Sequence, residues 1–226
     1  MSTLAHVLEA AGLVTIALSS NLSVVERMHP PRVLHCEFPL GRPLGKPGDV
    51  EYQRDVLHRA FALYDATEPV LEIHPDVIEA DETPMACALP PRYDPNLPPA
   101  VDEARALRAA YDRALAKHGA TSVGRTISVD QIYEALDVFH QWANGAPWKE
   151  TPLPDRNAIG ICLDIRAYYE EAGLELVDGP TPGGRSTESW FYESTEAGKT
   201  LMAARAALKA QEAPFPLWFY MAPAHR

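Results

Sequence analysis

The stretch Arg32–Asp49, RVLHCEFPLGRPLGKPGD, decides the fold predicted for the first third of the chain. It opens with a short, mostly apolar segment, Arg32–Phe38, which has the length typical of a strand buried inside a sheet. A loop with three glycines and three prolines follows it. Asp49 then stands where a helix N-cap is expected. The local order is therefore strand, rigid loop and helix.

The same alternation continues on both sides of this stretch. Apolar runs at Leu13–Leu18 and Pro69–His74 predict two further strands, and the segments between the strands have helical periodicity. Strands that alternate with helices pair in parallel. We therefore predict an α/β fold, in which residues 1–75 form a small parallel sheet with helices on both faces.

The rest of the chain differs in character. Residues 76–99 are rich in proline and acidic side chains, which predicts an irregular connection. Residues 100–226 are predicted to form a mainly helical extension packed on the first segment, with helices at 100–118, 128–143, 155–173 and 195–211. In the third of these, Asp155 is the expected cap and Gly173 the expected end. The stretch LELVDG at Leu174–Gly179 is compatible with one more strand.

Composition excludes several classes of function. The chain of 226 residues carries a formal net charge of −11, which disfavours binding to nucleic acid or to an anionic membrane surface. It has no apolar run long enough to span a membrane. Its three cysteines are widely spaced and form no CxxC pair, so neither disulfides nor a zinc site are expected. A reducing, cytoplasmic compartment is the expected location.

Cys36 is the candidate catalytic residue, because ligands of parallel α/β sheets bind outside the carboxyl ends of the strands. His35 and Arg42 are near enough in sequence to supply charge, although strand alternation directs His35 and Glu37 away from the Cys36 face. The alternative is that Cys36 is a small buried core residue. The substrate-binding residues that we predict are His35, Glu37, Gly41, Arg42 and Gly45.

No cofactor is predicted. The loop Gly41–Gly48 departs from the phosphate-binding P-loop in its glycine spacing, and Pro47 replaces the required serine or threonine. The sequence has no GxGxxG dinucleotide motif and no GxSxG nucleophile motif. His35 and Glu37 provide only two possible metal ligands on one strand face, so no metal site is predicted.

The segment from about residue 4 to residue 66 resembles the C-terminal part of the selenoprotein B subunits of glycine, sarcosine, betaine and D-proline reductases. In that family an Ala-Gly pair and a strand, a helix, and a strand leading into a PLGNP-like loop occur in this order. The matching positions here are Ala11, Gly12, Pro39, Leu40, Gly41 and Pro43.

The resemblance implies reductive cleavage of a carbon–nitrogen bond in a small amino-acid-like or amine substrate. The family's selenocysteine-x-x-cysteine motif has no counterpart in this sequence, so no catalytic residue carries over. Two interpretations remain. In one, the chain is a thiol-dependent reductase, or a subunit of one, that uses Cys36. In the other, it is a noncatalytic binding or structural subunit whose protein partner supplies the redox pair. A protein partner or a homo-oligomer is expected in either case.

Overall fold

The strand predicted at Arg32–Phe38 is the middle strand of a parallel sheet in the computed structural model, which describes residues 2–39, 41–80, 83–179 and 181–226. This strand, β2 (Arg32–Glu37), pairs with β1 (Ala17–Ser19) and with β3 (Val70–Val77). The four central residues of β2, 33–36, are each at most 5% exposed, so both of its faces are covered. The predicted small parallel sheet is thereby confirmed.

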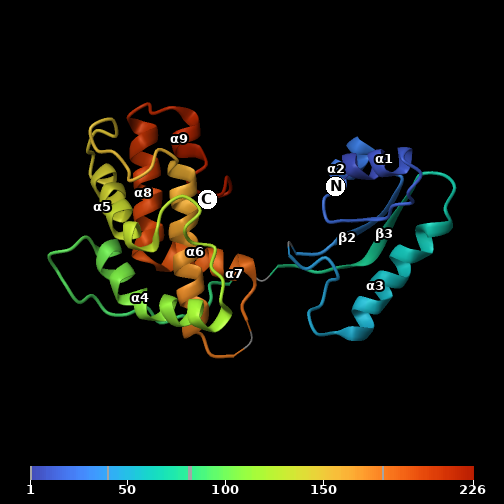
Figure 1. Ribbon diagram of the computed structural model, residues 1–226, viewed down its shortest axis with the longest axis horizontal. Coiled ribbons are helices and arrows are strands. Elements are labelled where there is room, and N and C mark those ends of the chain that lie inside the picture. Colours follow the sequence, from blue (N-terminus) through green and yellow to red (C-terminus); the bar gives the residue numbers. More distant parts are fainter. Residues whose placement is uncertain (1, 40, 81–82, 180) are drawn as a thin grey trace. The chain divides into compact units, whose positions relative to one another are not determined.

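Helices cover the two faces of this sheet (Figure 1). The first two helices, α1 (Ser2–Ala10) and α2 (Leu22–Met28), lie on one side of the strands, and α3 (Val50–Ala62) lies on the other. The predicted cap of α3 is confirmed, because the Asp49 carboxylate accepts a hydrogen bond of 3.1 Å from the Tyr52 amide. α3 and the short 3₁₀ helix η1 (Leu63–Asp65) close a core of Leu34, Cys36, Phe38, Val56, Ala60 and Leu63.

The outer strands differ from the sequence prediction at their ends. Leu13–Leu18 was predicted as a strand, but pairing with β2 begins only at Ala17, and Leu13 and Val14 are 57% and 45% exposed. Thr15 instead contacts Glu9: the amide and the hydroxyl of Thr15 both donate hydrogen bonds to the Glu9 carboxylate. At the other edge, β3 continues past the predicted end at His74 to Val77.

The chain divides into the α/β unit, Met1–Asp81, and a helical unit, Glu82–Arg226. In the helical unit, α4 (Pro99–His118) packs on α6 (Ala158–Leu176), and α5 (Ile132–Ala143) packs on α8 (Glu196–Ala210). The smaller elements are η2 (Val129–Gln131), α7 (Gly184–Ser194) and α9 (Phe215–Phe219). The largest fully buried side chains of the core are Phe139, Tyr168, Tyr169, Trp190 and Phe191. The predicted helical C-terminal extension is confirmed.

Three sequence predictions in this unit are wrong in detail. Leu174–Gly179 is not a strand, because α6 runs on to Leu176. Gly173 does not end that helix: a Cβ there would lie 2.5 Å from the Met85 side chain and 2.8 Å from Trp190, so the glycine allows close packing. The cap of α6 is Asn157 rather than Asp155, since the Asn157 side chain accepts from the Gly160 amide.

The proline-rich connection is divided between the two units. Met85 is 5% exposed within the helical core, and its amide donates a 3.2 Å hydrogen bond to the Ser186 carbonyl of α7. The segment from residue 83 onward therefore belongs to the helical unit, whereas residues 76 and 77 complete β3. The division between the two units falls at 81/82.

Candidate functional site

A small cavity lies at the carboxyl ends of β1 and β2, where ligands of parallel sheets are expected. Its volume is about 120 Å³, which is below the range of cavities that bind drug-sized ligands. The described residues that line it come from the two strand ends and from the loop after β2: Leu18, Ser19, Ser20, Cys36, Phe38, Pro39, Gly41, Arg42 and Pro43. The cavity therefore suits a small molecule that contacts hydroxyl groups, a thiol and a guanidinium group.

Cys36 reaches this cavity from the face of β2 that packs on α3. The side chain is 3% exposed, and burial raises the pKa of its thiol to about 11. The group is thus a neutral thiol at neutral pH, because burial without compensating positive charge disfavours the thiolate. A reactive thiolate at Cys36 would need a positive charge close to the sulfur, and no cation offsets the effect of burial on its pKa here.

The loop after β2 is built from successive tight turns. The Arg42 amide donates to the Pro39 carbonyl at 3.0 Å, and the Gly45 amide donates to the Arg42 carbonyl at 2.9 Å. These turns place Gly41 and Arg42 on the cavity wall. No ion pair joins the half-buried Arg42 to another residue within the described parts of the chain. Leu40, a position of the family match, lies outside the described residues.

The structure brings three of the predicted site residues together, Cys36, Gly41 and Arg42, and places the other three elsewhere. His35 is 5% exposed and follows the strand alternation onto the face opposite Cys36. Glu37 is exposed at the end of β2. Gly45 has a packing role, because its φ is +80° and a Cβ there would lie 2.5 Å from the Tyr52 ring.

Sequence reasoning missed the contribution of β1. Ser19 and Ser20 follow the apolar run that was predicted as the first strand, so the rule that placed Cys36 at a strand end applies to them equally. His74 does not line the cavity but supports it from outside: it is 4% exposed and packs on the lining residue Phe38, with the two ring centroids 5.1 Å apart. The Asp76 amide donates to His74 Nδ1 at 3.1 Å, so Nε2 carries the proton of the neutral ring.

Larger cavities lie in the helical unit. In the one beside the end of α4, several of the polar side chains already pair with one another. The volume of this cavity is about 440 Å³. There Lys117 binds Glu175 at 3.0 Å, and Glu171 accepts from the Thr121 hydroxyl and the Ser122 amide. A ligand would have to break these pairs, so the cavity at Cys36 is the stronger candidate.

The described residues offer no metal site and no membrane span. Within residues 2–39, 41–80, 83–179 and 181–226, no three His, Cys, Asp or Glu side chains are grouped so that they could hold a metal ion. No helix formed by these same residues is both long enough and apolar enough to cross a membrane.

Alkylation of the three cysteines is expected to follow their exposure. Cys87 is the most exposed of them and should react first with iodoacetamide, whereas the buried Cys36 should react slowly at pH 7.5. Because the Cys36 pKa is about 11, its rate should rise by about tenfold per pH unit up to pH 10. Peptide mass spectrometry measures each rate. A fast Cys36 reaction that levels off below pH 8 would instead reveal a reactive thiolate.

Comparisons of the chain with protein-family models, with curated proteins and with solved structures find no match.

Proposed function

We propose that the α/β unit binds a small carboxylate-bearing amine or amino acid in the cavity at Cys36 and Arg42, and that the chain serves as a subunit of a thiol-dependent reductase complex. The observation that carries the proposal is the position of Arg42. It lies on the wall of a small cavity at the carboxyl ends of β1 and β2, together with two serines and a thiol.

A carboxylate ligand suits this cavity for electrostatic reasons. An arginine guanidinium group binds a carboxylate through two parallel hydrogen bonds, which fixes the ligand's orientation as well as its charge. The Ser20 hydroxyl offers a further donor from the neighbouring strand end, whereas the Ser19 hydroxyl already donates to the Asn21 carbonyl at 3.4 Å. The volume of about 120 Å³ favours a ligand with only a few heavy atoms.

The state of Cys36 favours the binding role over the nucleophilic role. A thiol with a pKa of about 11 is a poor nucleophile near neutral pH, since the thiolate is the reactive form. The resemblance to selenoprotein B subunits supports a reductive reaction, and the sequence lacks the redox pair of that family. We therefore assign substrate binding to this chain and the reactive chalcogen to a partner chain. In this arrangement the uncharged thiol of Cys36 lines the cavity beside the substrate.

Replacing Arg42 by alanine should weaken binding of a small carboxylate by about 10- to 100-fold, because a hydrogen bond to a charged group contributes about 1.5–3 kcal/mol. The measurement is isothermal titration of the chain with glycine, sarcosine and betaine, and with methylamine as the ligand that lacks a carboxylate. Arg54→Ala is the matched control, since Arg54 is an exposed arginine of α3 outside the cavity. Equal affinities in R42A and R54A would contradict the proposal.

A further inference from the structure

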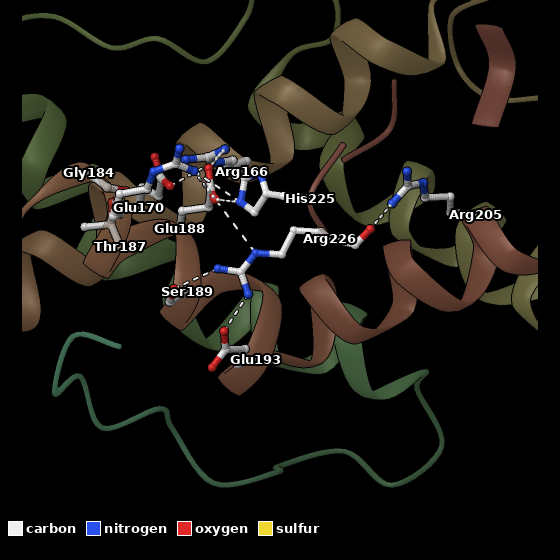
Figure 2. Close-up of polar contacts among 11 residues, drawn as sticks. Arg166, Glu170, Gly184, Thr187, Glu188, Ser189, Glu193, Arg205, His225 and Arg226 are labelled. Carbon is white, nitrogen blue, oxygen red and sulfur yellow. Dashed lines mark hydrogen bonds and ion pairs between the residues drawn. The ribbon is translucent and has the colours of Figure 1, made fainter. Parts of the chain in front are cut away.

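A cluster of charged side chains around α7 is already satisfied within the chain (Figure 2). The Glu188 carboxylate is 8% exposed, and its two oxygens lie 3.1 Å from Arg166 Nη1 and 2.9 Å from His225 Nε2. Arg226 Nε lies 3.7 Å from the same carboxylate. A ligand would have to displace one of these partners, whereas the cavity at Cys36 in the α/β unit is open to a small ligand without such an exchange.

Phe38 is the bulkiest of the described residues that line the cavity at Cys36. It is 6% exposed and belongs, like Cys36, to the buried cluster that α3 covers. The cavity lies at the ends of β1 and β2, whereas the aromatic neighbours of the Phe38 ring are His74 on β3 and Tyr52 on α3. The ring therefore stands between the cavity and the third strand.

The Phe38 ring is held in place from the side away from the cavity. The His74 ring meets it edge-on with the centroids 5.1 Å apart, and the Tyr52 ring lies tilted at 6.0 Å, in arrangements that aromatic pairs favour. The loop after β2 also approaches closely, since a Cβ on Gly45 would lie 3.2 Å from the Phe38 ring. Because a close-packed interior has no space to spare, the ring cannot withdraw without moving these three residues.

We propose that Phe38 is the specificity-determining residue of this cavity, and that its ring restricts the ligands to carboxylates without a large substituent on the α-carbon. This inference rests on the proposed binding of a carboxylate by Arg42. A cavity of about 120 Å³ leaves little room beyond the carboxylate and the α-carbon. A longer side chain would enter the space that the Phe38 ring fills, and the ring has nowhere to move.

The test compares the unsubstituted full chain with Phe38→Ala and Phe38→Leu by isothermal titration with glycine and L-norvaline. L-Norvaline keeps the carboxylate and the amine of glycine and adds a propyl group. F38A should bind L-norvaline at least about tenfold more tightly than the unsubstituted chain does, because one methylene that an apolar pocket admits or rejects already changes binding by about 10- to 200-fold. F38L should show a smaller gain, and neither variant should bind glycine more tightly.

Leu63→Ala is the matched control, because Leu63 is a buried residue of the same core and is not among the described residues that line the cavity. Truncating Leu63 opens space in the core but not beside the ligand. L63A should therefore keep the preference of the unsubstituted chain for glycine. An L-norvaline gain in L63A equal to that in F38A would show that general loosening of the core sets the limit, and would overturn the proposal.

The failure of this inference is distinguishable from the failure of the proposed function. If the unsubstituted chain binds glycine but folded F38A and F38L bind L-norvaline no better than it does, the role of Phe38 alone is overturned. If the unsubstituted chain does not bind glycine at all, the proposed carboxylate site falls and this inference falls with it. Circular dichroism establishes whether each variant is folded.

The unsubstituted chain provides a second measurement that needs no variant to fold. Its affinity should fall steeply along the series glycine, L-alanine and L-norvaline, because each added carbon approaches the Phe38 ring more closely. Equal affinities along this series would overturn the proposal whatever the variants do.

Discussion

Replacing Asp164 by alanine should lower the unfolding free energy of the helical unit by about 2–4 kcal/mol, because a buried donor left without a partner costs about 1–3 kcal/mol and a hydrogen bond to a charged group contributes about 1.5–3 kcal/mol. Asp164 is 1% exposed on α6. Its carboxylate accepts from three successive backbone amides, those of Arg125, Thr126 and Ile127, at 3.3, 2.8 and 2.9 Å. The substitution leaves the buried Ile127 amide unpaired and removes the hydrogen bonds that hold the loop leading into η2.

Tryptophan fluorescence during urea unfolding measures this loss in the helical unit alone. All four tryptophans, Trp142, Trp148, Trp190 and Trp218, lie after residue 82. Asp178→Ala is the matched control, because Asp178 is an exposed aspartate near the end of the same helix and should change stability by less than about 0.5 kcal/mol. A D164A midpoint within error of the D178A midpoint would show that the three hydrogen bonds do not hold the loop.

Replacing Glu103 by glutamine should change how the stability of the helical unit depends on pH. Glu103 is 8% exposed on α4, and one of its carboxylate oxygens accepts from the Glu196 and Ala197 amides at the start of α8, at 2.8 and 3.3 Å. Burial raises its pKa from 4.5 to about 7. The folded protein therefore holds this proton more tightly than the unfolded chain does.

The sign of the effect follows from that difference. The stabilisation from the Glu103 proton is complete below pH 4.5 and is lost as the pH rises through about 7. The two pKa values differ by about 2.5, which corresponds to a loss of at most about 3 kcal/mol. A glutamine keeps an acceptor for the α8 amides and has no proton to lose. E103Q should therefore gain stability relative to the unsubstituted chain between pH 5 and pH 8.

Urea unfolding at several pH values between 5 and 8 measures this gain. Other groups that titrate in this range contribute equally to both proteins, so the difference between them isolates Glu103. Glu134→Gln, at an exposed position of α5, is the control and should give a profile parallel to that of the unsubstituted chain. A parallel profile for E103Q as well would mean that Glu103 is ionised in the folded state throughout this range.

Much of the fold could be predicted because single segments carry their own signals. The apolar run before Phe38, the cap at Asp49 and the helical spacing after residue 100 each specify an element locally. The ends of elements could not be predicted in the same way. Residues 13–16 look like part of a strand in the sequence, but their pairing with β2 begins only at Ala17. Gly173 looks like a helix end, but it lies inside a helix because Met85 and Trp190 pack closely against it.

The candidate site shows the same limit. The strand-end rule placed Cys36, and the loop composition led to Gly41 and Arg42. His35 and Glu37 are adjacent to Cys36 in sequence, but the two-residue period of a strand turns them away from it. The pairing of β1 with β2 contributes Ser19 and Ser20, and 37 residues of chain separate Glu188 from the His225 that binds it. Contacts across such distances in sequence depend on tertiary packing.

The most direct test of the central claim is an amide-resolved NMR titration of the whole chain with glycine. If the α/β unit binds small carboxylates at Cys36 and Arg42, the amides of Ser19, Ser20, Cys36, Gly41 and Arg42 should shift together and saturate, while those of α4 and α6 remain unchanged. Saturable shifts confined to the cavity beside α4, or no shift at millimolar glycine, would contradict the account.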